Sequence, residues 1–177
     1  MSIRQIQLVY NEEQDRLLLR FATADQSEFR FWLTRRFVKR WWGLLTKMLA
    51  WDGMVMQQAT PPAKQAMVAF QHERHTAEAD FKQPFADSAV SFPLGETPVI
   101  IGKVNATRQD TGMVKMSLLP VQGAGIDIVV DAKLLHLLVK LLQDAVGRSD
   151  WDIRLPIAPQ VPVASDEGST PRTLTEG

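Results

Sequence analysis

Residues 126–142 read IDIVVDAKLLHLLVKLL, and this run predicts a strand that passes directly into a helix. Ile126, Ile128 and Val130 stand at every second position, which is typical of a strand with one buried face. Asp131 can cap a helix, because its carboxylate accepts hydrogen bonds from the unpaired amides of a first turn. The residues after it form one apolar stripe at three- and four-residue spacing, made of Leu134, Leu135, Leu138, Leu141, Leu142 and Val146.

The same order of features stands 97 positions earlier. Thr34, another capping residue, matches Asp131, and Phe29, Phe31 and Leu33 match the alternating strand residues. The residues after Thr34 again predict a helix with one apolar stripe. This stripe contains Phe37, Val38, Trp41, Leu44, Leu45, Met48 and Leu49.

A predicted β-hairpin precedes each strand–helix run. Its apolar positions are Ile6, Leu8 and Tyr10 with Leu17, Leu19 and Phe21, and later Val99–Thr107 with Val114, Met116 and Leu118. When the two halves are aligned with an offset of 97, no gap is needed from the second strand of the hairpin to the end of the helix. The first strand of the hairpin is offset by about one further residue. Identical side chains are nearly confined to Leu44-Leu45 and Leu141-Leu142. The pattern therefore supports a structural pseudo-symmetry and leaves gene duplication open.

The predicted fold class is α+β, with two pseudo-repeated antiparallel β-hairpin–strand–helix units packed as one domain. Each unit exposes a sheet face and a helix stripe, so the two must pack together. Thr60-Pro61-Pro62 predicts the start of an inserted helix. Beyond it, Phe85 and Phe92 lie among prolines, which favours an extended edge segment. The expected boundaries are a single domain at 1–155, with unit one at 3–52, the helical insertion at 60–80 and unit two at 98–152, then a disordered proline-rich tail at 156–177.

Composition excludes several classes of site. The chain has 177 residues, a net charge of zero and no cysteine, which excludes disulfides, thiolate metal ligands and a cysteine nucleophile. No segment approaches the roughly 18 consecutive apolar residues of a membrane-spanning helix. The N-terminus lacks the apolar stretch of a secretory signal. We expect a cytoplasmic protein with no membrane span.

The helix after Thr34 carries the most unusual predicted surface. Basic residues lie opposite its apolar stripe, next to tryptophans, and such a surface can bind single-stranded nucleic acid, an acidic partner or a membrane surface. A solvated basic face with Trp41 in the core is the alternative reading. Gly43 lies inside the same helix, where a close approach of another backbone, within the fold or across a dimer interface, would explain it, as would chance. The candidate partner or nucleic-acid residues are Arg35, Arg36, Lys39, Arg40, Trp42 and Lys47.

Motifs for metal binding, phosphate binding or catalysis are poorly defined in this sequence. His72, His75 and Glu78 recur every three residues and could approach one metal ion, but a fourth ligand is not evident. These histidines and His136 are expected on solvent faces. Gly123 precedes a strand, so a hairpin turn explains it better than a phosphate-binding loop. We expect no metal, no cofactor and no catalytic residue.

One resemblance rests on Ile126–Asp131 running into Leu134–Leu142. Three strands, a helical insertion, further strands and a leucine-rich helix with an acidic cap resemble the head domains of the superfamily that contains the DNA end-joining scaffold protein and the centriolar cartwheel protein. The resemblance implies a head that dimerises and precedes a coiled coil. Here Gly147 and the proline-rich tail stand where the coil would follow.

The leading hypothesis is a non-enzymatic protein-interaction or scaffold module that binds a protein partner or itself as a homodimer. The alternative is a single-stranded nucleic-acid-binding protein that uses the basic, tryptophan-flanked helix. A small-ligand site between the two units is a third hypothesis.

Overall fold

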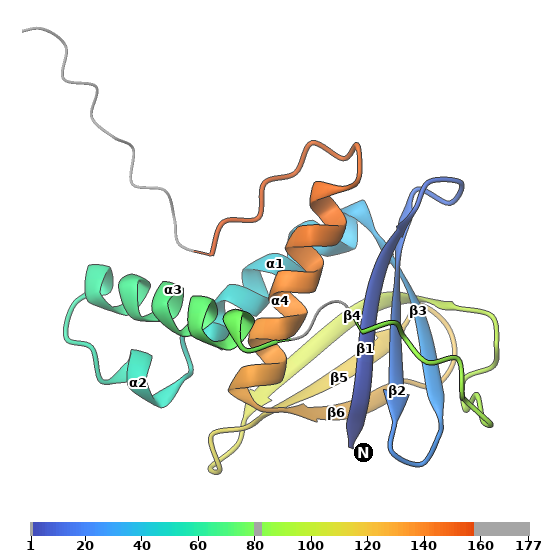
Figure 1. Cartoon of the computed structure of the whole chain (residues 1–177), viewed down its shortest axis with the longest axis horizontal. Helices are drawn as coiled ribbons and strands as arrows, with labels where there is room; N and C mark the ends of the chain where they lie inside the picture. Colours follow the sequence, from blue (N-terminus) through green and yellow to red (C-terminus); the bar gives the residue numbers. More distant parts are fainter. Residues whose placement is uncertain (1, 80–82, 158–177) are drawn as a thin grey trace, which may run out of the picture.

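The first half of the chain forms three antiparallel strands and a long helix (Figure 1). The computed structural model describes residues 2–79 and 83–157. Thr34 caps the helix as predicted, since its hydroxyl accepts a hydrogen bond from the Phe37 amide at 3.2 Å. The four elements are β1 (Ile3–Asn11), β2 (Arg16–Thr23), β3 (Glu28–Thr34) and α1 (Arg35–Leu49).

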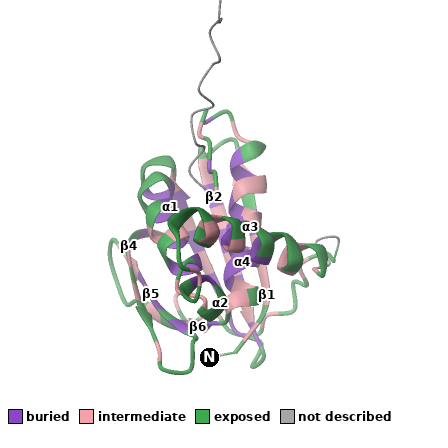
Figure 2. Cartoon of the chain, turned by 90° about the vertical axis from the view of Figure 1, so that its left-hand side faces the viewer, coloured by how far each residue is buried: buried purple, intermediate pink, exposed green. Residues whose placement is uncertain are grey.

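Two helices follow, α2 (Gly53–Met56) and α3 (Pro61–Ala77). Thr60 caps α3 by accepting from the Ala63 amide at 3.3 Å, and Pro61 occupies the first turn, where its missing amide needs no partner. The predicted inserted helix is therefore confirmed. In Figure 2, which looks onto the helical side, α2 and α3 carry many exposed residues.

The second half again forms three strands and a helix. Asp131 caps the helix as predicted, because its carboxylate accepts from the Leu134 amide at 2.7 Å. Gly123 has a φ of 90° in the loop before the third strand, which agrees with the expected turn. The elements are β4 (Val99–Arg108), β5 (Val114–Pro120), β6 (Ile126–Val130) and α4 (Ala132–Gly147).

The six strands form one sheet in the order β1-β2-β3-β4-β5-β6. All neighbours are antiparallel except β3 and β4, which pair in parallel through Phe31 with Val99 and Trp32 with Ile100. A mixed sheet with helices confirms the predicted α+β class.

The register of β2 with β3 can be compared with that of β5 with β6. β2 and β3 pair Leu17 with Leu33, and β5 and β6 pair Val114 with Val130. Each of the later positions stands 97 residues after its earlier counterpart. The inward side chains at these pairs are buried on the helical side of the sheet.

Each long helix packs on strands of both halves (Figure 1). α1 follows β3 but also packs on β4, and α4 follows β6 but also packs on β1. The sheet curves around one core beneath these helices, and α3 packs on α4 from outside. Neither half therefore encloses its own core.

The end of the described chain packs against the domain. Leu155 is buried and Ile157 contacts the core. The predicted disordered tail began at Pro156, and residues 158–177 lie outside the described residues. Across the described ranges, no helix is both long and apolar enough to cross a bilayer.

Candidate functional site

A groove runs between β1 and α4, which belong to opposite halves of the chain. Its volume is about 590 Å³. One wall is β1 from Arg4 to Val9, and the other is the face of α4 that carries Leu137 and Leu141. Glu78 and Ala79, which follow α3, and residues 83–85 also line it. It lies between the two predicted units.

The strand in this wall has a free edge. In the described part of the chain β1 pairs only with β2, so the backbone groups of its other edge have no strand partner. Such edges are usually blunted by charges, prolines or short length. β1 has nine residues, one charged side chain, Arg4, and no proline, although its register shifts between Ile3 and Gln5. The connector passes this strand at Gln5, whose side-chain oxygen accepts a hydrogen bond from the Ala86 amide at 3.1 Å.

The opposite wall is the border of the apolar side of α4, where two leucines stand between charged residues. Lys133, Leu137, Leu141, Asp144 and Arg148 recur at three- and four-residue spacing, so they follow one line along the helix. The two leucines are half-buried, and charged side chains stand toward both ends. The predicted stripe did not include Leu137. The available signal was that Leu137 stands four residues before Leu141, at the border of the predicted stripe, and so widens the apolar side of α4.

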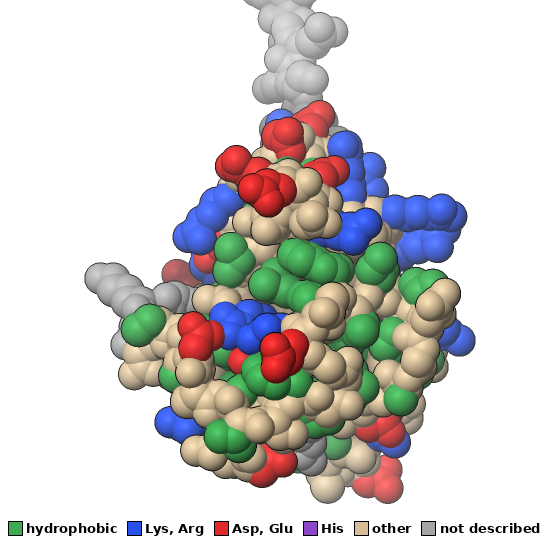
Figure 3. All heavy atoms as spheres, turned by 90° about the vertical axis from the view of Figure 1, so that its right-hand side faces the viewer, with side chains coloured by type: hydrophobic (Ala, Val, Ile, Leu, Met, Phe, Trp, Pro, Cys, Tyr) green, Lys and Arg blue, Asp and Glu red, His purple; other side chains and the backbone are tan. Residues whose placement is uncertain are grey.

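The outer face of the sheet carries a row of apolar side chains. Register places Val9, Leu18, Trp32 and Ile100 side by side on β1 to β4, and the Val121 amide donates to the Ile100 carbonyl at 2.8 Å. In Figure 3 hydrophobic side chains gather across the middle of this side, below a group of acidic side chains. Val9 also lines the groove, so the row and the groove meet at β1.

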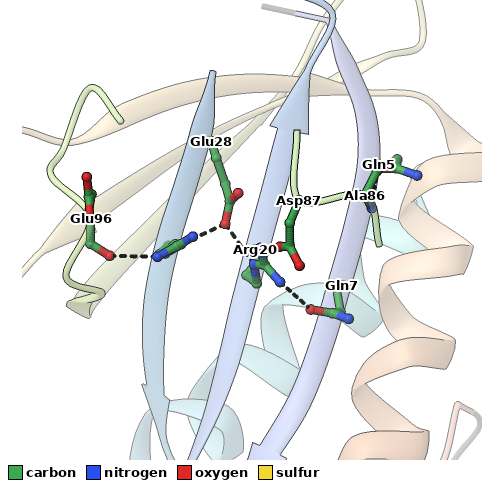
Figure 4. Close-up of polar contacts among 8 residues, drawn as sticks. Gln5, Gln7, Arg20, Glu28, Ala86, Asp87 and Glu96 are labelled. Atoms are coloured by element: carbon green, nitrogen blue, oxygen red, sulfur yellow. Dashed lines mark hydrogen bonds and ion pairs between the residues drawn. The ribbon is translucent and has the colours of Figure 1, made fainter. Parts of the chain in front are cut away.

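An ion-pair network fastens the connector before β4 to this outer face (Figure 4). Glu28 is 1% exposed and accepts from the Nε atoms of Arg20 and Arg30, both at 2.7 Å. Burial would raise the pKa of Glu28, but the two guanidinium groups outweigh it and lower that pKa. Asp87 of the connector pairs with Arg20, and aromatic rings of the connector lie 4.1 and 4.7 Å from the two guanidinium groups. The charges balance, so the network is structural.

This contact changes the prediction for the connector. Phe85 and Phe92 lie against the face of the sheet, over Arg20 and Arg30. Only the part of the segment at Val90 and Ser91 pairs with an edge, through hydrogen bonds with Gln26 and Glu28 at the start of β3. A single bridge joins Ser27 to Ser91. The prolines explain the lack of regular pairing, and the arginines beneath the rings supply the contact that the sequence pattern did not reveal.

The basic face of α1 is exposed, but Trp42 does not belong to it. Arg35, Arg36, Lys39, Arg40 and Lys47 are all exposed, and in the described residues none of them forms an ion pair. Trp42 is 9% exposed, and its indole N–H donates to the Pro156 carbonyl at 3.2 Å. The segment after α4 folds back onto Trp42, a contact that helix periodicity cannot predict. This face therefore offers cations without that stacking ring.

Gly43 of the same helix is exposed, and a Cβ built there meets nothing within 4 Å. No other backbone in the described fold approaches it. Of the explanations offered by the sequence, a close approach within the fold is therefore wrong.

The three histidines lie together between α3 and α4, and the expected solvent positions of His72 and His136 are wrong. His72 and His136 are 8% and 1% exposed, and their Nδ1 atoms lie 3.2 Å apart. The His75 ring stacks on His136 with centroids 5.1 Å apart. Burial, then the neighbouring histidines, lower the pKa of His136 to about 4, and burial also lowers the pKa of His72. The stripe of α4 left His136 on its polar side, but α3 covers that side.

Residues for metal or acid–base chemistry do not converge elsewhere. Within residues 2–79 and 83–157, no three histidine or acidic side chains are arranged to hold a metal ion. A second cavity of about 310 Å³ lies beside His136 and includes Asp52, Arg108 and Asp131. The two aspartates cap helices, and Arg108 donates to the Trp51 carbonyl at 3.1 Å. Its charged groups are therefore already engaged.

Comparison with protein-family models, with curated protein sequences and with solved structures gave no match. The resemblance to the end-joining and cartwheel head domains remains a prediction.

Proposed function

We propose that the chain is a non-enzymatic protein-interaction module that binds an extended polypeptide segment in the groove between β1 and α4. The observation that carries this proposal is the groove of about 590 Å³ between the Leu137–Leu141 face of α4 and β1, a strand that pairs only with β2 among the described residues. An extended segment can satisfy the edge with backbone hydrogen bonds and the wall with apolar side chains.

The composition of the groove favours a polypeptide over a small ligand. Pockets for small molecules place a few polar groups precisely on an apolar lining. The groove is long and lined along one side by six consecutive residues of one strand, Arg4 to Val9, and its polar and charged side chains are spread along it from Lys133 to Arg148 rather than gathered at one point. A long lining of this kind can contact a polypeptide along several residues, whereas recognition of one small molecule requires polar groups that converge on it.

Random peptides displayed on phage provide the test. Peptides selected on the whole chain are measured by fluorescence anisotropy against the parent chain and Leu137→Glu. Leu137 is half-buried and lies outside the packed core, so the variant should fold. We expect at least tenfold weaker binding, because a carboxylate would be desolvated in the groove.

Phe70→Glu is the matched control. Phe70 is a helical apolar residue, 56% exposed on α3, and does not line the groove. Its binding should stay within twofold of the parent chain. Selected peptides that bind Leu137→Glu and the parent chain equally would refute the groove as the binding surface.

A second candidate function, binding of single-stranded nucleic acid, is supported by the five exposed basic side chains of α1 that form no ion pair among the described residues. Phosphate contacts release counterions, so affinity must fall steeply with salt. Arg35→Gln with Arg36→Gln should reduce the salt slope by about 2. Salt-independent or undetectable binding would eliminate this candidate.

A further inference from the structure

We propose that α3 is a pH-released arm, which separates from α4 when the histidines between the two helices take up protons, while the sheet, α1 and α4 stay folded. The opening uncovers the side of α4 that carries His136, which is 1% exposed while the arm is closed. This inference goes beyond the proposed function, because the three histidines lie outside the groove between β1 and α4.

α3 is attached to the rest of the fold by a narrow contact (Figure 1). It packs mainly on α4 and α2, and of its 17 residues only Val68, Gln71 and His72 are buried. α1 has 15 residues and buries seven, all of them apolar. Separation of α3 therefore exposes little apolar surface. Segments with few buried apolar contacts open locally at a lower cost in free energy than the whole domain.

The buried side chains of this contact are partly unsatisfied. Gln71 is 1% exposed, and its Nε2 donates to the Met54 sulfur at 2.9 Å, whereas its Oε1 has no hydrogen-bond partner among the described residues. Nδ1 of His75 is also buried and also lacks a partner in the described part of the chain. A polar atom buried without a partner costs free energy in the closed state, and water satisfies it once the arm opens. The contact is therefore weak even before a proton binds.

A pair of histidines makes this contact sensitive to protons. Nδ1 of His72 on α3 lies 3.2 Å from Nδ1 of His136 on α4, and the His75 ring stacks on His136 with centroids 5.1 Å apart. A neutral pair can share one N–H between the two Nδ1 atoms, but two imidazolium rings would place two N–H groups against each other. Separation of α3 from α4 moves the rings apart and gives each charged ring access to water.

The charged groups that face the pair carry both signs. They come from α3, α4, the start of α2 and the cavity beside His136, and they are Arg74, Lys140, Arg108, Asp144, Asp52 and Asp131. Lys140 forms an ion pair with Asp144, and the other two carboxylates accept hydrogen bonds from helix amides. The three carboxylates are thus already engaged. Burial outweighs them and lowers the pKa of both histidines, that of His136 from 6.5 to about 4.

The size of the effect follows from linkage. A histidine exposed by the opening regains the ordinary pKa of 6.5, whereas the closed His136 has a pKa of about 4. The open arm therefore binds protons first, and between pH 7.5 and 5 His136 alone should raise the equilibrium constant for opening about 30-fold. His72 acts in the same direction, since burial lowers its pKa as well.

Amide hydrogen exchange of the full chain, followed by NMR at pH 7.5 and 5 and corrected for intrinsic rates, tests this inference. We expect the opening constant of the α3 amides to rise about 30-fold or more. At pH 5 these amides should exchange at least tenfold faster than those of β2 and β5, because the sheet stays folded. Exchange of α3 and the sheet at one common rate, or an opening constant for α3 that changes less than threefold, overturns the inference.

Two variants assign the effect to the histidine pair. His72→Gln with His136→Gln removes both imidazoles, so the rise in the opening constant of α3 between pH 7.5 and 5 should fall to threefold or less. Lys64→Gln, at an exposed position of α3, is the control and should keep the rise of the parent chain. An unchanged rise in the double variant overturns the role of the pair. If the double variant does not fold, the exchange rates of the parent chain still decide whether α3 opens by itself.

Discussion

Protonation of His136 should destabilise the fold as the pH falls. The ring is 1% exposed, and its Nδ1 lies 3.2 Å from Nδ1 of His72, so one ring must accept the hydrogen bond without a proton. Burial and the neighbouring histidines lower the pKa of His136 from 6.5 to about 4. We therefore predict that His136→Gln, which cannot acquire a charge, weakens the pH dependence of stability.

The sign and size follow from linkage. Because the folded pKa lies below the unfolded value, the unfolded chain binds a proton first. The part of the free energy of unfolding that depends on a neutral His136 is fully present above pH 6.5 and is lost as the pH falls toward 4. One pKa unit corresponds to about 1.4 kcal/mol, so the difference between 6.5 and about 4 amounts to about 3 kcal/mol. At neutral pH the variant should be less stable by about 1–3 kcal/mol, because the buried His72 loses its partner.

Urea unfolding followed by tryptophan fluorescence, at several pH values between 7.5 and 4, measures both effects. Between these limits the free energy of unfolding of the parent chain should fall by about 3 kcal/mol more than that of His136→Gln. The carboxylates titrate in both proteins, so their contributions to the pH dependence of the free energy of unfolding cancel in this comparison. Parallel pH profiles, separated by a constant amount, would refute the reasoning. The denaturant dependence must stay equal in both proteins, since a change would indicate an altered unfolded or native state.

Two further changes test particular contacts. Gly43→Ala should raise the free energy of unfolding by about 1 kcal/mol, because the site is helical, exposed and open; a loss of stability in urea unfolding would show that the space is occupied. Glu28→Gln should lower that free energy by about 3 kcal/mol, because two guanidinium groups lose a buried carboxylate. Asp127→Asn, at the exposed ion pair with Lys115, should cost less than about 1 kcal/mol in the same assay, and equal losses in the two variants would contradict the reasoning.

Much of the fold was predictable because its signals are local. The alternation at Leu17 and Leu33 and the caps at Thr34 and Asp131 depend on residues a few positions apart, and the structure contains the expected strands and helices. Local periodicity indicates which face of an element is buried. It does not indicate what buries that face.

The errors all arise from partners that are distant in sequence. His136 lies under α3, Trp42 lies under the segment at Pro156, and α4 packs on a strand more than 120 residues earlier. The groove was also missed for this reason, since its walls come from β1 and α4. Leu137, at the border of the predicted stripe, was the one local sign that the apolar side of α4 is wider than that stripe.

The packing of α4 on β1 affects the order in which the chain can fold during synthesis. The first strand leaves the ribosome early, but its covering helix is among the last parts of the described domain to be made. Until then the first hairpin carries an uncovered apolar face, and contacts so distant in sequence slow folding. Nascent chains that end before residue 131 should therefore remain sensitive to protease, and protection should arise in one step once α4 has emerged.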